Sequence, residues 1–267
     1  MKLSVFYDHL REGAAQRGVS LSQALCEVRA AGIECVELDF DAVSADPKGL
    51  RTTLQSANLQ AGSLYGFFDF GHQNQSARAR ALLDCADDMG ARYVLAVPGF
   101  LEPGDDEAAC MARMDESLRS LCAEASARGI TVLMEDFDSI SAPYATARQL
   151  RRFLDAVPDL RCALDTGNFL YSGEDVLNAF PLLANRIRYV HLKDRARSPR
   201  PGEKGVPDAK GCMLYSASVG MGVIPIAECL RQLFAIGYDG TLAIEHFGSP
   251  DQLGDIGRSA AFVLALL

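Results

Sequence analysis

Apolar residues recur at helical spacing near the N-terminus, and the pattern changes immediately afterwards. Leu21, Ala24, Leu25 and Val28 are spaced i, i+3, i+4 and i+7, which predicts one apolar face of a helix. Gly32 follows, and glycine commonly ends a helix because it adopts positive φ without steric cost. The next segment, IECVELDF, is rich in apolar and β-branched residues. It therefore predicts a strand that starts directly after the helix.

The same order of helix, glycine and strand recurs along the chain. Its clearest copies are RAAGIECVELDF, DDMGARYVLAVPG, SARGITVLMEDF and FAIGYDGTLAIEHF. Weaker copies and the opening segment KLSVFY bring the predicted strands to eight. These strands are expected at residues 3–7, 34–39, 60–65, 92–97, 130–135, 161–165, 187–192 and 241–246. Over 267 residues this is about 33 residues per repeat, the size of one strand with its helix.

Strands that alternate with amphipathic helices indicate a parallel sheet covered by helices. Eight units of even length favour a closed (β/α)₈ TIM barrel, formed by residues 1–267 as a single domain. An open doubly wound sheet is the alternative, and it would require a phosphate-binding turn after the first strand. That turn reads YDHLREGAAQRG and contains no G-x-G-x-x-G motif, so the barrel is favoured.

One segment interrupts the repeat. Residues 195–220 contain three Pro and four Gly between the seventh strand and the helix that follows it. This connection is much longer than the usual 2–6 residues of such a turn. In a barrel it would lie at the carboxyl ends of the strands, as a lid, as a subunit contact or as an ordered surface loop.

Composition and charge narrow the class of protein. The chain carries 26 basic and 35 acidic residues, a net charge of −9, which disfavours nucleic acid as the main partner. No apolar run reaches the roughly 20 residues of a membrane helix, and the first residues do not resemble a signal peptide. Eight cysteines without a C-x-x-C pair indicate reduced thiols. We therefore expect a cytoplasmic protein that is not bound to a membrane.

The chemistry is concentrated at the predicted carboxyl ends of the last four strands. These strands end in Glu135, Asp165, His191 and Glu245, and active sites of barrels lie at this end. Three carboxylates brought together repel one another unless a divalent cation lies between them. Because the set is rich in oxygen and has no thiolate, it suits Mn²⁺, Mg²⁺ or Co²⁺. A single acidic strand end such as Glu37 is more often a solvated or hydrogen-bonded residue.

At these positions the sequence resembles the xylose isomerase-like barrels, a family of sugar phosphate isomerases and epimerases. The resemblance covers most of the chain and is clearest from residue 130 onward. It rests on five ordered motifs: VLMED, ALDTGN, VHLKD, SVGMGVIPI and GYDGTLAIEHF. The resemblance implies one divalent cation, with Mn²⁺ the first expectation, bound by Glu135, Asp165, His191 and Glu245.

The resemblance also implies a reaction. A keto sugar or keto-polyol would bind the cation, and Glu135 and Glu245 would remove and return a proton next to the carbonyl. Isomerisation, epimerisation and dehydration share this first step. The leading hypothesis is a sugar isomerase or epimerase. The alternatives are a lyase, such as an inosose or 3-dehydroshikimate dehydratase, and a barrel subunit without catalytic activity.

Four further residues are predicted to contact the substrate. Arg197 lies six residues after His191, where keto-sugar epimerases of the family place an arginine, and Asn168 stands where many members carry a histidine. His9 and His72 follow the first and third predicted strands and are candidates to line the pocket. The extra histidine ligands of the DNA-repair branch are absent. The expected partners are therefore a small carbohydrate-like molecule and other copies of the chain, in a dimer or tetramer.

Overall fold

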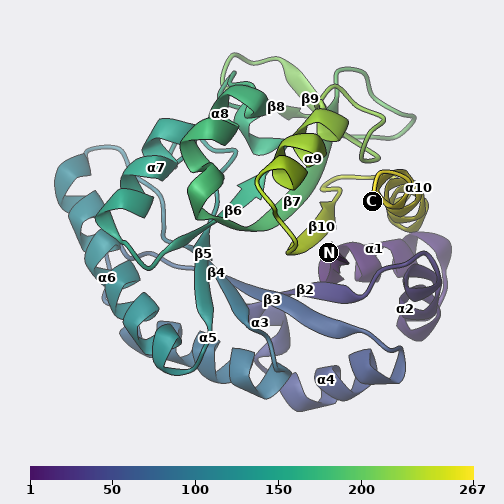
Figure 1. Cartoon of the computed structure of the whole chain (residues 1–267), viewed down its shortest axis with the longest axis horizontal. Coiled ribbons are helices and arrows are strands. Elements are labelled where there is room, and N and C mark those ends of the chain that lie inside the picture. Colours follow the sequence, from purple (N-terminus) through teal and green to yellow (C-terminus); the bar gives the residue numbers. More distant parts are fainter.

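The computed structural model describes residues 1–267 and contains a closed parallel barrel (Figure 1). Hydrogen bonding follows the order β1-β2-β3-β4-β5-β6-β7, and β10 pairs with both β7 and β1 to close the ring. The predicted (β/α)₈ barrel is thus confirmed. Its strands are β1 (Lys2–Phe6), β2 (Cys35–Asp39), β3 (Gln60–Phe67), β4 (Tyr93–Val97), β5 (Thr131–Met134), β6 (Arg161–Asp165), β7 (Ile187–Ala196) and β10 (Thr241–Glu245).

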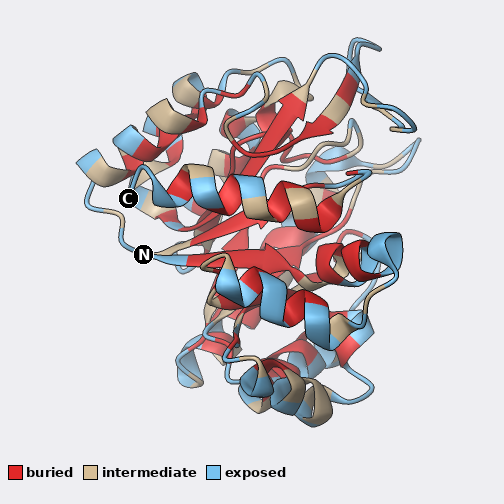
Figure 2. Cartoon of the chain, turned by 90° about the vertical axis from the view of Figure 1, so that its right-hand side faces the viewer, coloured by how far each residue is buried: buried red, intermediate tan, exposed pale blue.

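Ten helices surround the barrel. Figure 2 shows the buried strands in the interior and the helices outside, with exposed residues on their outer faces. The helices are α1 (Tyr7–Arg17), α2 (Leu21–Ala30), α3 (Phe40–Val43), α4 (Pro47–Ser56), α5 (Ser76–Met89), α6 (Glu107–Ala127), α7 (Ala147–Ala156), α8 (Val176–Leu183), α9 (Ile226–Ala235) and α10 (Gln252–Leu264). None of them combines the length and the apolarity that a membrane-spanning helix requires.

Local sequence explains where these helices begin. At α2, the Ser20 hydroxyl accepts the backbone N–H of Gln23, and the Gln23 side chain accepts the backbone N–H of Ser20. This capping box satisfies two N–H groups that a helix start leaves without partners. Thr146 and Gln149 form the same arrangement at α7. Capping therefore fixes the point at which the chain turns from a loop into these two helices.

The strand β7 is longer than the sequence pattern predicted, and this changes the site. It continues to Ala196 instead of ending at residue 192. The extension is possible because β9 (Met213–Ala217) pairs with it antiparallel, with Arg195 opposite Ser216. A short strand, β8 (Val206–Pro207), pairs in turn with β9. The segment 195–220 is therefore a hairpin built onto the carboxyl end of β7.

A single carboxylate holds the turn that follows this hairpin. Asp194 accepts backbone N–H groups from Gly220 and Gly222 through Oδ2 and from Ile224 through Oδ1, at 2.9–3.0 Å. A Cβ atom at Gly222 would lie only 2.2 Å from Asp194 Oδ1, so this position requires glycine. The motif SVGMGVIPI is therefore a turn wrapped around the carboxylate of Asp194.

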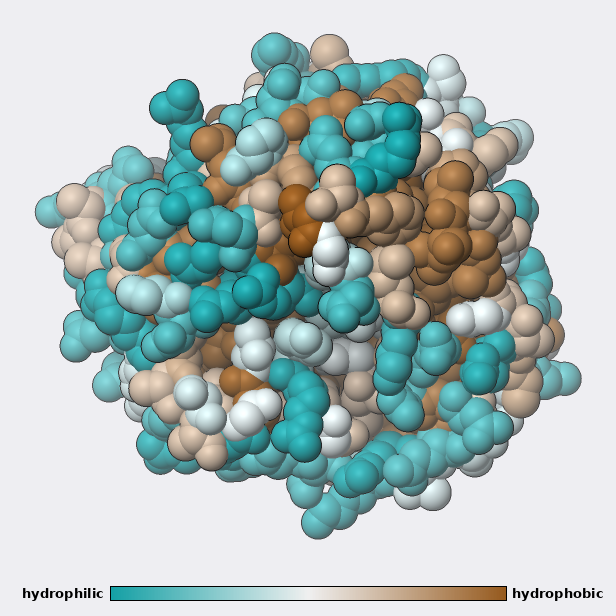
Figure 3. Space-filling view, in the orientation of Figure 1, coloured by the Kyte–Doolittle hydropathy of each residue, from teal (hydrophilic) through white to brown (hydrophobic).

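The two ends of the barrel differ in what they expose. Both termini lie at the same end, where the strands begin (Figures 1 and 2). On the face drawn in Figure 3, hydrophobic side chains gather near the C-terminus, where Leu264, Leu266 and Leu267 are exposed. The strands run away from this face, so their carboxyl ends and the candidate chemistry lie at the opposite end.

Candidate active site

Four consecutive elements of the barrel bring the predicted ligand residues together. Glu135 directly follows β5, Asp165 ends β6, His191 lies within β7 and Glu245 ends β10. The side chains of Asp165, His191 and Glu245 are buried, and that of Glu135 is 12% exposed. The parallel register explains the convergence, because Asp165 lies opposite His191 and the β10 register is set by its pairing with β7.

The two glutamates meet at one nitrogen of His191. Its Nδ1 lies 2.8 Å from Oε2 of Glu135 and 3.7 Å from Oε2 of Glu245. Potential ligand atoms of Glu135, Asp165 and His191 all lie within 4.8 Å of one another. Glu135, Asp165 and His191 therefore form a compact cluster, and Glu245 adjoins it through its contact with His191.

Two buried atoms of this cluster have no hydrogen-bond partner. Asp165 Oδ1 accepts the backbone N–H groups of Gly167 and Asn168, at 2.7 and 2.9 Å, but Oδ2 has no partner. Nε2 of His191 is also buried and unpartnered. A buried carboxylate oxygen without a partner is costly, and a hard divalent cation would satisfy it. The residues therefore fit a divalent metal ion.

The electrostatics of the cluster indicate the same need for positive charge. Burial raises the pKa of Asp165 to about 6, and the charge of Glu245 adds to this effect while Lys193 opposes it. Burial alone would lower the pKa of His191, but the carboxylates of Glu135 and Glu245 outweigh it and raise that pKa to about 9. The two carboxylates thus favour the protonated form of His191. A cation bound to the same carboxylates would compete with that proton.

Lys193 supplies one permanent positive charge inside the site. Its Nζ lies 2.7 Å from Oε1 of Glu245 and 3.7 Å from Oδ2 of Asp165, and it donates to Oδ1 of Asn168 at 2.7 Å. Burial would lower the pKa of Lys193, but the carboxylates of Glu245, Asp165 and Asp138 raise it. The ammonium therefore stays charged and fixes the orientation of Glu245.

A cavity of about 480 Å³ opens directly above the cluster, and the cluster residues Glu135, His191 and Glu245 form part of its lining. Its aromatic wall is formed by Phe6, Tyr65, Phe67, Phe137 and Phe247. The size is that of a small-molecule site. The cavity therefore has a polar, charged base and largely aromatic sides.

The hairpin β8–β9 forms one side of this cavity. Lys204, Val206, Leu214 and Ser216 all belong to it or to the loop leading into it, and all four line the cavity. The segment 195–220 therefore lies over the site, as expected from its position after the seventh strand. Whether it also contacts another subunit stays a prediction.

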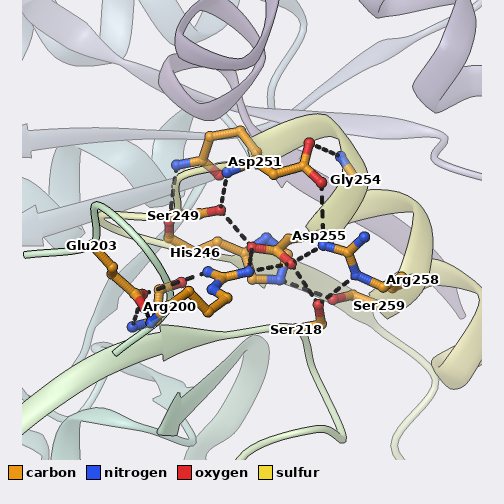
Figure 4. A network of polar contacts seen from close by, with 12 residues as sticks. Arg200, Glu203, Ser218, His246, Ser249, Asp251, Gly254, Asp255, Arg258 and Ser259 are labelled. Carbon is orange, nitrogen blue, oxygen red and sulfur yellow. Dashed lines mark hydrogen bonds and ion pairs between the residues drawn. The ribbon is translucent and has the colours of Figure 1, made fainter. Parts of the chain in front are cut away.

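A buried polar network holds this segment against α10 (Figure 4). Arg200 donates to both carboxylate oxygens of Asp255, at 2.8 and 2.9 Å. Glu203 accepts the backbone N–H groups of Arg200 and Ser216, at 2.8 and 2.9 Å. The network also includes His246, the residue after Glu245, whose Nε2 lies 2.8 Å from Oγ of Ser259 on α10. One wall of the cavity is thus anchored through an ion pair to the last helix.

The four predicted substrate contacts have different surroundings. Asn168 lines the cavity. His9 is buried behind it, where its Nε2 accepts the backbone N–H of His246 and its ring packs edge-to-face on Phe247. His9 therefore supports the cavity wall without lining it.

His72 and Arg197 lie outside the cavity. His72 is held in a surface loop by Asp69 and Asp105, with ring nitrogens 2.5 and 3.0 Å from their carboxylates. Arg197 is exposed and faces Asp208 within the hairpin segment, at 3.4 Å. β7 ends at Ala196, so Arg197 leaves the strand face that carries His191. The structure does not bring these two residues into the cavity, and their contact with substrate stays a prediction.

The sequence analysis missed Arg195, Asp138 and Lys204, which also line the cavity. Arg195 Nη2 donates to Asp138 Oδ2 at 2.8 Å. The usable signal was alternation along the strand, since His191, Lys193 and Arg195 occupy every second position of β7 and all line the cavity. It was lost because the strand was expected to end at residue 192.

Glu37, which was expected at a strand end, lies in the middle of β2 and has a structural role. It is fully buried and accepts hydrogen bonds from the hydroxyl groups of Ser4, Ser63 and Tyr189. Burial raises its pKa. All its partners are neutral hydroxyl groups, and it does not line the cavity.

Comparisons with known proteins identify the family of the chain. The family model of xylose isomerase-like TIM barrels matches residues 25–266. A putative L-ribulose-5-phosphate 3-epimerase of Escherichia coli (strain K12) is 24% identical over 257 residues, which cover 88% of this chain and 86% of that protein. An inosose dehydratase of Geobacillus thermodenitrificans (strain NG80-2) is 31% identical over 106 residues, which cover 38% of this chain and only 35% of that enzyme.

Solved structures show the same fold. A D-allulose 3-epimerase from Methylomonas sp. has a TM-score of 0.78 at 17% identity, covering 100% of this chain and 98% of that one. A xylose isomerase-like barrel from Mycobacterium smegmatis, solved in complex with magnesium, has a TM-score of 0.72 at 20% identity and covers 92% and 87%. The IOLI protein, solved with bound zinc, has a TM-score of 0.77 at 17% identity and covers 100% and 98%. From residue 25 to residue 266, this chain belongs to the xylose isomerase-like TIM barrel family.

Proposed function

We propose that this protein is a divalent-metal-dependent enzyme that removes the proton next to a carbonyl group of a small hydroxylated substrate, as an isomerase or epimerase. The observation that carries the proposal is the convergence of Glu135 and Glu245 on Nδ1 of His191, beside the unpartnered Oδ2 of Asp165. This arrangement supports a pair of bases that line the cavity, beside a site for a cation.

Glu135, Asp165, His191 and Glu245 would hold the ion. A bound divalent ion supplies Lewis-acid stabilisation of the negative charge that develops on the carbonyl oxygen. The donor set has three carboxylates and no thiolate, which favours Mn²⁺ or Mg²⁺. Asp165 is fixed for this role by two backbone N–H groups, so that only its Oδ2 is free.

The two glutamates would handle the proton. Both line the cavity and lie on separate strands on either side of His191, so they can approach a substrate from two directions. Epimerisation needs such a pair, because one carboxylate removes the proton and the other returns a proton to the opposite face. Lys193 holds Oε1 of Glu245 at 2.7 Å and acts as a positioning residue for that base.

Dehydration is the second candidate, and Lys193 is the observation that favours it. Its ammonium lines the cavity, where it could donate a hydrogen bond to a leaving hydroxyl group and stabilise the charge that develops on that oxygen. The partial similarity to an inosose dehydratase supports the same reaction class. The two candidates differ in their products, since only dehydration releases water and forms an unsaturated carbonyl compound.

Solvent deuterium exchange tests the proposal. The Mn²⁺-loaded protein is incubated in D₂O with a panel of keto sugars and keto-polyols, and proton NMR follows the signal next to the carbonyl. We expect its loss without loss of water, and a decrease of about 10²–10⁴-fold in Glu135→Gln and Glu245→Gln. Glu102→Gln, an exposed glutamate outside the cavity, is the matched control. Exchange that survives both active-site substitutions would contradict the assigned roles.

A further inference from the structure

Besides Lys193, two cationic side chains line the cavity and lie outside the candidate metal cluster. Arg195 is 4% exposed and uses Nη2 to bind Asp138, while its Nε is buried without a partner. Lys204 is exposed at the edge of the cavity on the hairpin segment and forms no ion pair within the chain. Neither residue is explained by metal binding or by proton transfer.

Most polar side chains of the cavity wall already form hydrogen bonds within the protein. The hydroxyl of Tyr65 donates to Asp8, that of Ser63 donates to Glu37, and the amide of Asn168 contacts Lys193 and the backbone oxygen of Asp136. A neutral sugar with many hydroxyl groups would therefore find few free partners apart from the cation and the two glutamates.

One hydroxyl in the wall is free, and it lies beside Arg195. The Oγ atom of Ser216 is buried and has no hydrogen-bond partner. Ser216 lies directly opposite Arg195 in the antiparallel pair of β7 and β9. The unpartnered Nε of Arg195, the unpartnered Oγ of Ser216 and the ammonium of Lys204 thus belong to one side of the cavity, the side formed by β7 and the hairpin.

The charges leave an excess of one positive unit on this side. A divalent ion together with Lys193 would balance the three carboxylates of the candidate metal cluster, and the carboxylate of Asp138 balances Arg195. Lys204 remains without a counter-charge. A carboxylate of the substrate would balance it, whereas a phosphate dianion would bring one negative charge too many.

We propose that the substrate is a hydroxylated carbonyl compound that also carries a carboxylate, bound by Arg195, Ser216 and Lys204. The inference rests on the proposed function, because it names the substrate class for the same site. The carboxylate would lie against the hairpin, and the carbonyl and its neighbouring hydroxyl would face the metal cluster. The aromatic side chains Phe67, Phe137 and Phe247 would cover the carbon skeleton between them.

Three compounds that differ only at one end test this inference. D-Fructose, D-fructuronate and D-fructose 6-phosphate share a ketose skeleton and carry a hydroxyl, a carboxylate and a phosphate at C6. Calorimetric titration into the Mn²⁺-loaded and the metal-free protein measures their binding, and deuterium exchange measures their reaction. We expect D-fructuronate to bind about tenfold more tightly than D-fructose, with an affinity that falls as salt is added.

Variants of the hairpin assign the effect to its residues. Lys204→Ala should remove most of the preference for D-fructuronate, while Lys210→Ala, an exposed lysine of the same segment outside the cavity, should leave it unchanged. Arg195→Lys retains a charge for Asp138 but lacks the guanidinium edge, so it should also weaken carboxylate binding. Because Lys204 is exposed, its loss should not disturb folding.

The outcomes separate this inference from the proposed function. Equal binding of D-fructose and D-fructuronate, tighter binding of the phosphate, or no binding of any of the three would overturn the carboxylate assignment. Preferential binding and exchange of D-fructuronate that persist unchanged in Lys204→Ala and Arg195→Lys would overturn it too, while leaving the proposed function intact. Binding of D-fructuronate that depends on Lys204, without exchange in any compound, would support the carboxylate site and contradict the proposed function.

Discussion

Two aspartates at the carboxyl end of the barrel are equally buried and have opposite surroundings. Asp165 and Asp255 both have an exposed fraction of 0%. Every oxygen of Asp255 is bonded, to Arg200, Arg258, Ser218 and Ser249 (Figure 4). Asp165 has backbone partners on one oxygen and none on the other. The difference separates a carboxylate that completes the fold from one that is kept available for a ligand.

The pKa values of the two carboxyl groups express the same contrast. Burial would raise both. For Asp255, two serine hydroxyls and two guanidinium groups outweigh burial, and its pKa lies below the ordinary range. For Asp165, burial dominates, although Lys193 opposes it, and the pKa rises to about 6. The hydrogen bonds and ion pairs around Asp255 thus stabilise its charged form. The charged form of Asp165 lacks such partners on one oxygen, and a bound cation would stabilise it.

The largest expected effect on stability comes from Asp255, the aspartate whose oxygens are all bonded. Asp255→Asn should lower the free energy of unfolding by about 3 kcal/mol, because it leaves the buried part of a charged network without its anion. Chemical denaturation at neutral pH measures this loss. Asp84→Asn, an exposed aspartate with a single-arginine contact, is the control and should show no change. An equally small effect of Asp255→Asn would mean that the network does not hold the hairpin to α10.

Asp165→Asn should act in the opposite direction in metal-free protein. The raised pKa means that a charged Asp165 destabilises the folded chain, so its replacement should add about 1–3 kcal/mol to the free energy of unfolding at pH 7. The gain should be complete above about pH 6 and should disappear below about pH 4, where the carboxyl is protonated in both states. Denaturation in EDTA across this pH range checks the sign. A loss of stability at pH 7 would show that Asp165, like Asp255, stabilises the fold.

Lys193→Met should give the smallest change. The substitution leaves Glu245 and Asp165 without their ammonium, but Asp165, whose pKa is already raised to about 6, can then take up a proton, which limits the net loss to about 1 kcal/mol in metal-free protein. Added Mn²⁺ should restore most of the lost stability, because a divalent ion supplies positive charge to the same carboxylates. Thermal melting with and without the ion measures both values. A loss that Mn²⁺ does not reverse would separate Lys193 from the metal cluster.

The sequence predicted the barrel and the convergence of the four strand-end side chains because both follow from the regular alternation of helices and strands. Helix, glycine and strand alternate at even spacing, and the ends of parallel strands must meet, so Glu135, Asp165, His191 and Glu245 could be placed together without coordinates. The cavity wall could not be predicted in this way. Arg195 reaches it only because β9, more than 15 residues further along the chain, pairs with β7 and prolongs the strand.

The residues placed by resemblance show the same limit. Arg197 occupies the expected position in sequence, but β7 ends one residue before it, and its side chain turns toward Asp208. His72 follows the expected strand, yet Asp69 and Asp105 hold it in a surface loop. Asn168 reaches the cavity because it starts the short 3₁₀ turn that begins three residues after Asp165, the last residue of β6. Substrate contacts in loops depend on tertiary pairing, which spacing alone does not encode.

The contrast between the two aspartates is tested most directly by metal content. Wild-type protein, Asp165→Asn and Asp255→Asn are loaded with Mn²⁺, freed of unbound ion by gel filtration and examined by elemental analysis. The account predicts about one ion per chain in the wild type and in folded Asp255→Asn, and almost none in Asp165→Asn. Absence of retained ion in the wild type, or equal retention in Asp165→Asn, would contradict it.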